Sequence, residues 1–148
     1  MPFELREAVP GDFEQLFQID RRCFPPGISY SRLELRSYMT RPGAFTLIAE
    51  TPAVVGFIVT ELGRRKIGHV ITIDVLPGAR RLGLGSALLS AAEGRVRAAG
   101  GREIYLETAV DNLAAISFYK KHDYYLEGTI PRYYPNGVDA FTMSKQLS

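Results

Sequence analysis

The feature that most constrains this sequence is a strand that leads through a glycine-spaced turn into a helix. Over residues 71–75 apolar side chains alternate with polar ones, which is typical of a strand. Apolar residues then recur at every fourth position over residues 84–96, which is typical of a helix. Gly83 and Gly85 therefore lie at a helix N-terminus, where free main-chain N–H groups and the helix dipole favour an anion. The sequence predicts a turn that binds phosphate.

The glycine spacing distinguishes between the known phosphate-binding turns. A P-loop needs a lysine directly after its second glycine, but Ser86 follows Gly85. A dinucleotide-binding fingerprint needs a third glycine where this chain has Leu88. Both kinds of site are therefore disfavoured, and the turn follows the pattern Arg-x-x-Gly-x-Gly that begins at Arg80, with Arg81 as a second cation.

A second group of residues lies on the helix that follows a predicted strand at residues 103–108. Asp111 or Asn112 is expected to cap this helix. Asn112, Ala115 and Tyr119 are spaced so that they lie on one helix face. Seven residues of helix rise about 10 Å, so one extended ligand can contact both Asn112 and Tyr119.

The two patterns together resemble the motifs of the GNAT superfamily of acetyl-CoA-dependent N-acetyltransferases. Its second motif is an asparagine, an alanine three residues on and a tyrosine four further, which this chain matches from Asn112 to Tyr119. The resemblance extends from Phe3 to about Leu147 and is closest to the branch typified by ribosomal-protein alanine N-acetyltransferase. The residues that carry it are Cys23-Phe24-Pro25, Leu106-Glu107, Asn112, Tyr119, Tyr133-Tyr134, Asp139-Ala140 and Met143. One position departs from the pattern, because Asp123 replaces the usual glycine before an aromatic residue.

The resemblance implies that acetyl-CoA is the cosubstrate. Within the branch, Glu107 corresponds to the general base, and Tyr119, twelve residues later, corresponds to the general acid. The resemblance also implies that main-chain N–H groups of the turn bind the pyrophosphate, that a strand N–H at residues 73–75 polarises the thioester carbonyl, and that Asn112 holds the pantetheine arm. The residues expected to bind acetyl-CoA are Ile73, Asp74, Val75, Arg80, Arg81, Leu82, Gly83, Leu84, Gly85, Ser86 and Asn112.

Four further side chains could take part in chemistry. Asp74 lies inside an apolar strand and is either a paired acid on the sheet face, which we favour, or a second candidate for the base. His69 and His122 have no cysteine or aspartate partners at ligand spacing, so we expect no metal and predict that both are surface residues. Cys23 is expected to pack rather than to react.

The acceptor is expected to be a primary amine, and proton energetics favour an N-terminal α-amine. At pH 7 an α-amine costs roughly 1 kcal/mol to deprotonate, whereas a lysine amine costs roughly 4–5 kcal/mol. The loop from Phe24 to Tyr30 and the hairpin from Tyr133 to Asn136 are expected to line the acceptor pocket. Tyr133 and Tyr134 are either strand aromatics or a cover over a peptide. The alternatives are an acetyltransferase for lysine or small amines, a non-catalytic acyl-CoA sensor and a nucleotide-binding module.

Composition sets broad limits on size, partners and location. The 148 residues suit one domain, residues 1–148. The 18 basic and 16 acidic residues give a net charge of +2, which does not indicate a nucleic-acid partner. The lone cysteine suits a reducing cytoplasm, and no apolar run suggests a membrane span or a secretion signal. Both a monomer and a homodimer remain open.

These observations predict an α/β (α+β) fold with a GNAT-like mixed, mostly antiparallel sheet of about seven strands flanked by about four helices. Strands are expected at residues 3–8, 44–50, 54–62, 66–75, 103–108, 124–132 and 138–146. Helices are expected at residues 12–22, at 31–40 after a Ser31–Glu34 capping box, at 84–99 and from residue 111 or 112. Asn136-Gly137 predicts a hairpin turn between the last two strands.

Overall fold

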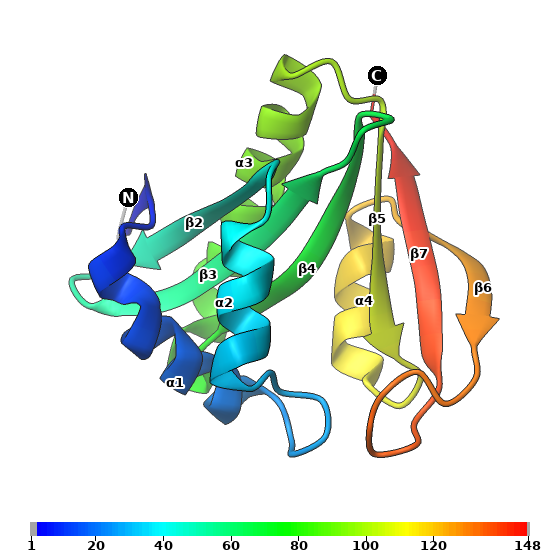
Figure 1. The fold of residues 1–148 in the computed structure, drawn as a ribbon, viewed down its shortest axis with the longest axis horizontal. Coiled ribbons are helices and arrows are strands. Elements are labelled where there is room, and N and C mark those ends of the chain that lie inside the picture. The colour runs from blue at the N-terminus through cyan, green and yellow to red at the C-terminus, as the bar shows by residue number, and fades with distance from the viewer. Residues whose placement is uncertain (1–2, 148) are drawn as a thin grey trace.

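The computed structural model describes residues 3–147, which form a seven-stranded sheet and four α-helices (Figure 1). The strands are β1 Glu4–Glu7, β2 Ala44–Glu50, β3 Val54–Leu62, β4 Ile67–Val75, β5 Glu103–Ala109, β6 Tyr125–Ile130 and β7 Ala140–Gln146. The helices are α1 Phe13–Cys23, α2 Arg32–Thr40, α3 Leu84–Ala98 and α4 Leu113–Lys121, with short 3-10 helices η1 Pro10–Asp12 and η2 Pro77–Leu82. The predicted fold class is confirmed.

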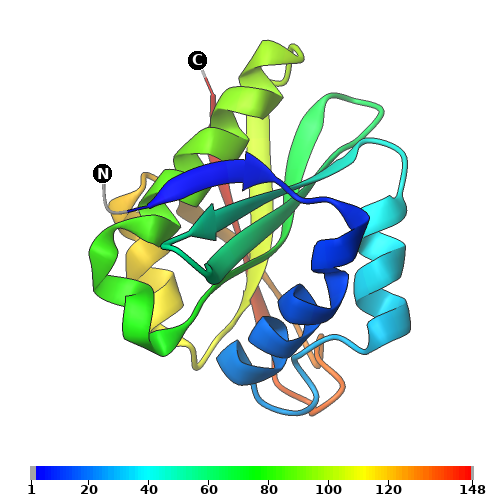
Figure 2. The same ribbon diagram turned by 90° about the vertical axis from the view of Figure 1, so that its left-hand side faces the viewer.

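The strands run in the order β1-β2-β3-β4-β5-β7-β6, and all neighbouring pairs are antiparallel except β4 and β5. Helices α1 and α2 cover one face of the sheet, and α3 and α4 cover the other, as Figure 2 shows from the side. Each face has its own apolar core. Leu16 and Leu35 are fully buried on the α1–α2 side, and every fourth residue over 84–96 is fully buried on the α3 side.

The parallel strands β4 and β5 pair over only part of their length. Their ladder runs from Ile67 opposite Glu103 to Val70 opposite Leu106, and the later residues of both strands lie outside it. The ladder between β3 and β4 skips Ile71, which forms a bulge at the same level. The C-terminal halves of β4 and β5 therefore separate (Figure 1), and the chain enters the predicted phosphate-binding turn from β4 and α4 from β5.

Local signals explain where two of the helices begin and end. Ser31 and Glu34 form the predicted capping box at the start of α2. Asn112 caps α4, because its Oδ1 accepts a hydrogen bond from the Ala115 N–H at 3.1 Å. After α4, Asp123 has a φ of 71°, in the left-handed region that aspartate enters more readily than most residues. Asp123 therefore adopts, at the end of α4, the left-handed backbone conformation that the usual glycine would adopt.

The last two strands are shorter than the sequence predicted. β6 ends at Ile130 rather than Arg132, and β7 begins at Ala140 rather than at residue 138. The predicted turn is present, since Gly137 has a φ of 87° and donates its N–H to the Tyr134 carbonyl at 2.8 Å. The Asp139 side chain accepts the Arg132 N–H in place of a ladder bond, so residues 131–139 form a loop, called here the β6–β7 loop.

Candidate active site

The predicted phosphate-binding turn connects β4 to α3. It passes through η2 and Gly83, which has a φ of 79°, and continues as α3. A Cβ atom on Gly83 would meet no atom within 4 Å, so the backbone conformation, rather than the available space, requires glycine. Ala87 donates its N–H to the Gly83 carbonyl, and the N–H groups of residues 84–86 have no acceptor within the helix. Those N–H groups suit an anion such as a phosphate.

Two residues of the turn have contacts that the sequence did not indicate. Arg80 donates its Nε–H to the Val75 carbonyl at 2.9 Å, which ties the turn to the end of β4. Gly85 faces α4, because a Cβ atom there would lie 3.3 Å from Cζ of Phe118. Gly85 therefore lets the first turn of α3 pack closely against α4.

His122 is not the surface residue that the sequence predicted. It lies half-buried at the end of α4, with its ring 4.7 Å from that of Phe118. Its Nε2 lies 2.9 Å from Oγ of Ser86, which is one of the predicted cofactor-binding residues. The Ser86 hydroxyl is therefore bonded within the protein, and its main-chain N–H is the part that can contact a ligand.

Tyr119, the predicted acid, is buried on α4. Its side chain is 7% exposed and packs against Tyr124 with 5.9 Å between the ring centroids. Burial raises the pKa of Tyr119, and the neighbouring Asp74 and Tyr134 raise it further. The phenol is therefore protonated at neutral pH, as a proton donor must be.

Glu107, the predicted base, forms a pair with His69. Oε1 of Glu107 lies 2.7 Å from Nε2 of His69, and the two side chains are 13% and 23% exposed. The His69 ring stacks on Tyr105 with 4.2 Å between centroids, because these residues are ladder partners on β4 and β5. The prediction that His69 is a surface residue is therefore wrong. The sequence could not reveal the contact, since His69 and Glu107 are 38 positions apart and only the strand pairing joins them.

Tyr133, in the β6–β7 loop, lies beside Glu107. Burial raises the pKa of Tyr133 to about 12, and the charge of Glu107 and a hydrogen bond to Glu107 contribute to the shift. Tyr134 stands nearly perpendicular to Tyr133, with 4.9 Å between the ring centroids. Tyr133 therefore covers the predicted base while 43% of its own surface stays exposed.

The two predicted acceptor loops meet. A Cβ atom on Gly27, which has a φ of 88°, would lie 2.8 Å from Cβ of Asn136 in the β6–β7 loop. At the end of residues 24–30, the Tyr30 hydroxyl donates to the carbonyl of Ile71, the bulge residue of β4, at 3.3 Å. Residues 24–30, called here the acceptor loop, therefore run from the β6–β7 loop to β4.

Asp74 is buried on β4, and Cys23 is half-buried at the end of α1, directly before the acceptor loop. Oδ1 of Asp74 accepts a hydrogen bond from the Thr72 hydroxyl at 2.5 Å, and its carboxyl group contacts Asp20 of α1. This paired position on the sheet face matches the favoured prediction. The Cys23 thiol donates to the Val75 carbonyl at 3.4 Å, and burial raises its pKa to about 11, so it is no nucleophile at neutral pH.

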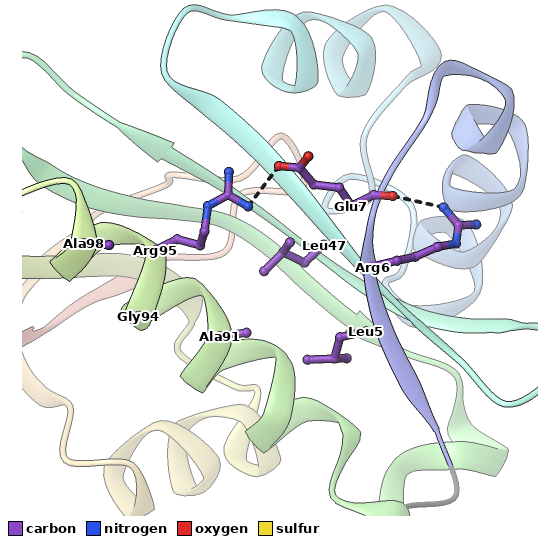
Figure 3. Close-up of a pocket in the computed structure, with 8 residues that line it drawn as sticks. All are labelled: Leu5, Arg6, Glu7, Leu47, Ala91, Gly94, Arg95 and Ala98. Atoms are coloured by element: carbon purple, nitrogen blue, oxygen red, sulfur yellow. Dashed lines mark hydrogen bonds and ion pairs between the residues drawn. The ribbon is translucent and has the colours of Figure 1, made fainter.

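Two cavities lie near the sheet. A groove of about 560 Å³ runs between β1 and α3, and none of the predicted site residues lines it (Figure 3). Its lining residues are Leu5, Arg6, Glu7, Leu47, Ala91, Gly94, Arg95 and Ala98, with an ion pair between Arg95 and Glu7 at its rim. A smaller cavity of about 240 Å³ is lined by Tyr105 and His69 together with Arg64 and Arg65. This second cavity adjoins the candidate site through His69.

Two kinds of feature are missing from residues 3–147. Within that span no helix is long and apolar enough to cross a membrane. Nor do three or more His, Cys, Asp or Glu side chains of the described chain gather where they could hold a metal ion.

Comparison with known proteins identifies the same family as the sequence motifs. Residues 13–124 match the model of the acetyltransferase (GNAT) family. The chain is similar to an N-alpha-acetyltransferase of Sulfurisphaera tokodaii, with 31% identity, and to one of Saccharolobus solfataricus, with 32% identity. Each alignment covers 98% of this chain and 93% of the relative.

Solved structures also match this chain over nearly its whole length. Ard1 from Thermoplasma volcanium matches with a TM-score of 0.90 and 26% identity, over 100% of this chain and 99% of that one. The ribosomal-protein-S18-alanine N-acetyltransferase of Escherichia coli matches with a TM-score of 0.87 over 99% and 94% of the two chains. At 22% identity the second match shows the fold alone.

Proposed function

We propose that this chain, which belongs to the acetyltransferase (GNAT) family, transfers the acetyl group of acetyl-CoA to the N-terminal α-amine of a protein or peptide. Similarity to two archaeal N-alpha-acetyltransferases along nearly the whole chain supports this acceptor. The structural observation that carries the proposal is the contact between Glu107 and His69. It holds a candidate base just beyond the last ladder pair of β4 and β5, where the two strands separate.

Acetyl-CoA fits the turn and the first turn of α3. The N–H groups of residues 84–86 have no acceptor within the helix, Gly83 gives the chain its left-handed corner, and Arg81 is exposed beside them. In the proposed complex, N–H groups of residues 81–86 hold the pyrophosphate and the side-chain NH₂ of Asn112 holds the pantetheine arm. Main-chain N–H groups of residues 73–75, next to the bulge of β4, face the thioester carbonyl.

Glu107 makes the acceptor amine nucleophilic. An amine attacks a thioester only when it is neutral, so its ammonium form must first lose a proton to Glu107. His69 bonds to one carboxylate oxygen and fixes the direction of the carboxylate. His69 also lines the smaller cavity, which gives the proton a route away from the site.

Tyr119 completes the proton balance. When the bond between the acetyl carbon and sulfur breaks, the sulfur leaves as a thiolate and requires a proton. Tyr119 supplies it, because burial keeps the phenol protonated until the thiolate forms. Acetyl-CoA contributes the activated acetyl group, and the chain contributes a base and an acid.

An α-amine suits this site better than a lysine amine. A single carboxylate must provide roughly 1 kcal/mol to deprotonate an α-amine at pH 7, against roughly 4–5 kcal/mol for lysine. The side chains that bond to Glu107 are those of His69 and Tyr133, and neither adds a carboxylate to support the harder step.

Three peptides of one sequence test the proposal. The first has a free N-terminus and no lysine, the second has a blocked N-terminus and one lysine, and the third has both a free N-terminus and the lysine. We expect acetylation of the α-amine at a rate about 100-fold or more above that of lysine, located by tandem mass spectrometry. Comparable labelling of the blocked peptide would assign a lysine acetyltransferase instead. Binding of acetyl-CoA without transfer to any peptide or small polyamine would favour the non-catalytic sensor.

A further inference from the structure

Two carboxyl groups meet in the interior between α1 and β4. Asp20 is 0% exposed and Asp74 is 1% exposed, and their side chains are in hydrogen-bond contact. Oδ2 of Asp20 accepts the Tyr30 N–H at 2.8 Å, and Oδ1 of Asp74 accepts from the Thr72 hydroxyl. The other two oxygens, Oδ1 of Asp20 and Oδ2 of Asp74, receive no hydrogen bond from an N–H or O–H group of residues 3–147.

A single proton shared between the two carboxyl groups gives both of these oxygens a hydrogen-bond partner. Ionised carboxylates only accept hydrogen bonds, and two of them side by side in the interior repel each other strongly. A proton on Asp74 lets that residue donate to Asp20, which satisfies both oxygens and leaves one negative charge in place of two. Burial raises the pKa of Asp74 well above its usual range, and the hydrogen bond to Asp20 and its charge raise it further. Burial also raises the pKa of Asp20, but hydrogen bonds from Asp74 and Tyr30 oppose that shift.

The groups packed around the pair do not remove the need for this proton. Arg80 is the nearby cation that favours ionised Asp74, but its Nε–H donates to the Val75 carbonyl. Cys23 has a pKa of about 11, and burial raises the pKa of Tyr30 and of Tyr119. These three groups are therefore neutral at neutral pH.

The pair links the acceptor loop to β4. β4 is held independently by its ladder with β3, in which Asp74 lies opposite Phe57. The acceptor loop has no such ladder, and its own bonds from residues 28 and 29 return to the Pro25 carbonyl. Its last residue, Tyr30, is fixed by its N–H to Asp20 and by its hydroxyl to the Ile71 carbonyl.

We propose that Asp20 and Asp74 form a positioning pair, in which one shared proton fixes the acceptor loop against β4 and thereby sets the geometry of the acceptor site. This inference rests on the proposed function, in which that loop borders the acceptor. Loss of the proton leaves two adjacent negative charges and separates α1 from β4. The acceptor loop, which Asp20 holds through the Tyr30 N–H, then moves with α1 and pulls against the bond from the Tyr30 hydroxyl to the Ile71 carbonyl.

Asp20→Asn is the informative variant. The asparagine oxygen can still accept the Tyr30 N–H, and its NH₂ can donate to ionised Asp74, so both links and the single negative charge remain without a shared proton. Asp20→Ala removes both links. Thr60→Val is the control, because the buried Thr60 hydroxyl on β3 also lacks a bonding partner within residues 3–147 but does not belong to the pair.

The first measurement is unfolding by denaturant at a series of pH values without substrate. Folded wild type holds one proton that the unfolded chain has released above about pH 5. Its unfolding constant should therefore rise about tenfold per pH unit relative to that of Asp20→Asn, until the pH reaches the pKa of the pair. Stability from the pair is thus greatest at low pH and is lost as pH rises. A constant ratio of unfolding constants between pH 5 and 7.5 would overturn the shared proton.

The second measurement is steady-state kinetics at pH 6.5 with an N-terminal peptide. Asp20→Ala should raise the acceptor KM about tenfold or more and leave the acetyl-CoA KM within about threefold, whereas Asp20→Asn and Thr60→Val should keep both near wild type. An acceptor KM for folded Asp20→Asn as high as that of Asp20→Ala would overturn the positioning role. If no peptide is acetylated by wild type but the unfolding profiles still diverge, the shared proton stands and the proposed acceptor falls.

Discussion

Nε2 of His69, within the β4–β5 ladder, lies 2.7 Å from Oε1 of Glu107, the first residue of β5 beyond the last ladder pair of Val70 and Leu106. One side of this contact is held by the strand ladder, and the other side lies where the strands separate. The ladder and the stack of His69 on Tyr105 hold the imidazole, and the strands separate just past it. The carboxylate is therefore fixed where the two strands separate, which is the proposed place of the reacting groups.

His69→Phe should lower the rate without weakening acetyl-CoA binding. Phenylalanine preserves the stack on Tyr105 but makes no hydrogen bond to Glu107, so the base loses its orientation. We expect kcat for a peptide acceptor to fall about 10- to 100-fold, by analogy with the loss of other orienting hydrogen bonds. His69→Gln, which can still bond to the carboxylate, should lose less. Equal rates for His69→Phe and wild type would show that the pair serves packing only.

Tyr119→Phe tests the acid. The loss of the phenolic proton should slow turnover by about 10²–10⁴ and leave acetyl-CoA affinity within a few-fold. Tyr124→Phe is the matched control, because the Tyr124 hydroxyl is also buried but bonds to Glu93 at 2.8 Å, on the side of α3. That variant should lose about 1–3 kcal/mol of stability and retain its turnover. Stopped-flow single-turnover rates check both expectations, and similar chemical rates for the two variants would remove Tyr119 from catalysis.

Gly85→Val tests the turn. The added side chain meets Phe118 and displaces the first turn of α3, whose N–H groups are proposed to bind the pyrophosphate. Calorimetry should show a loss of about 2 kcal/mol or more in acetyl-CoA binding, equivalent to one or two charge-assisted hydrogen bonds. Gly94→Val in the same helix is the control, since a Cβ atom there meets nothing within 4 Å. If both folded variants bind acetyl-CoA like wild type, the turn is not the pyrophosphate site.

The sequence predicted what depends on local pattern. The sequence predicted β2 and β3 with the bounds observed, and the fourfold spacing of apolar residues placed α3 to within one residue. Neighbouring residues also predicted a cap at Asp111 or Asn112, and the structure has the cap at Asn112. Glu107 and Tyr119 came from the superfamily resemblance, and their roles remain predictions that the variants above test.

The side-chain pairs that the sequence did not reveal join distant parts of the chain, whereas the unexpected bond of Arg80 to Val75 is local. His69 meets Glu107 through a parallel strand pair, and Asp20 meets Asp74 because α1 packs on β4. Both histidines were predicted at the surface because each lacks a suitable partner nearby in sequence. Likewise, the shorter β6 and β7 reflect the side-chain bond of Asp139, which replaces the ladder. The spacing of apolar residues and the composition do not reveal which strands and helices become neighbours in the fold.

The dependence of rate on pH for Glu107→Gln tests the central claim most directly. Glutamine keeps the size of Glu107 and can bond to His69, but it cannot take a proton. With an N-terminal peptide as acceptor, we expect the variant to be most impaired near pH 6–7 and the defect to shrink as pH approaches about 9.5, because solvent then deprotonates the α-amine. Parallel wild-type and Glu107→Gln profiles between about pH 6 and 9.5 would contradict the assignment of Glu107 as the base.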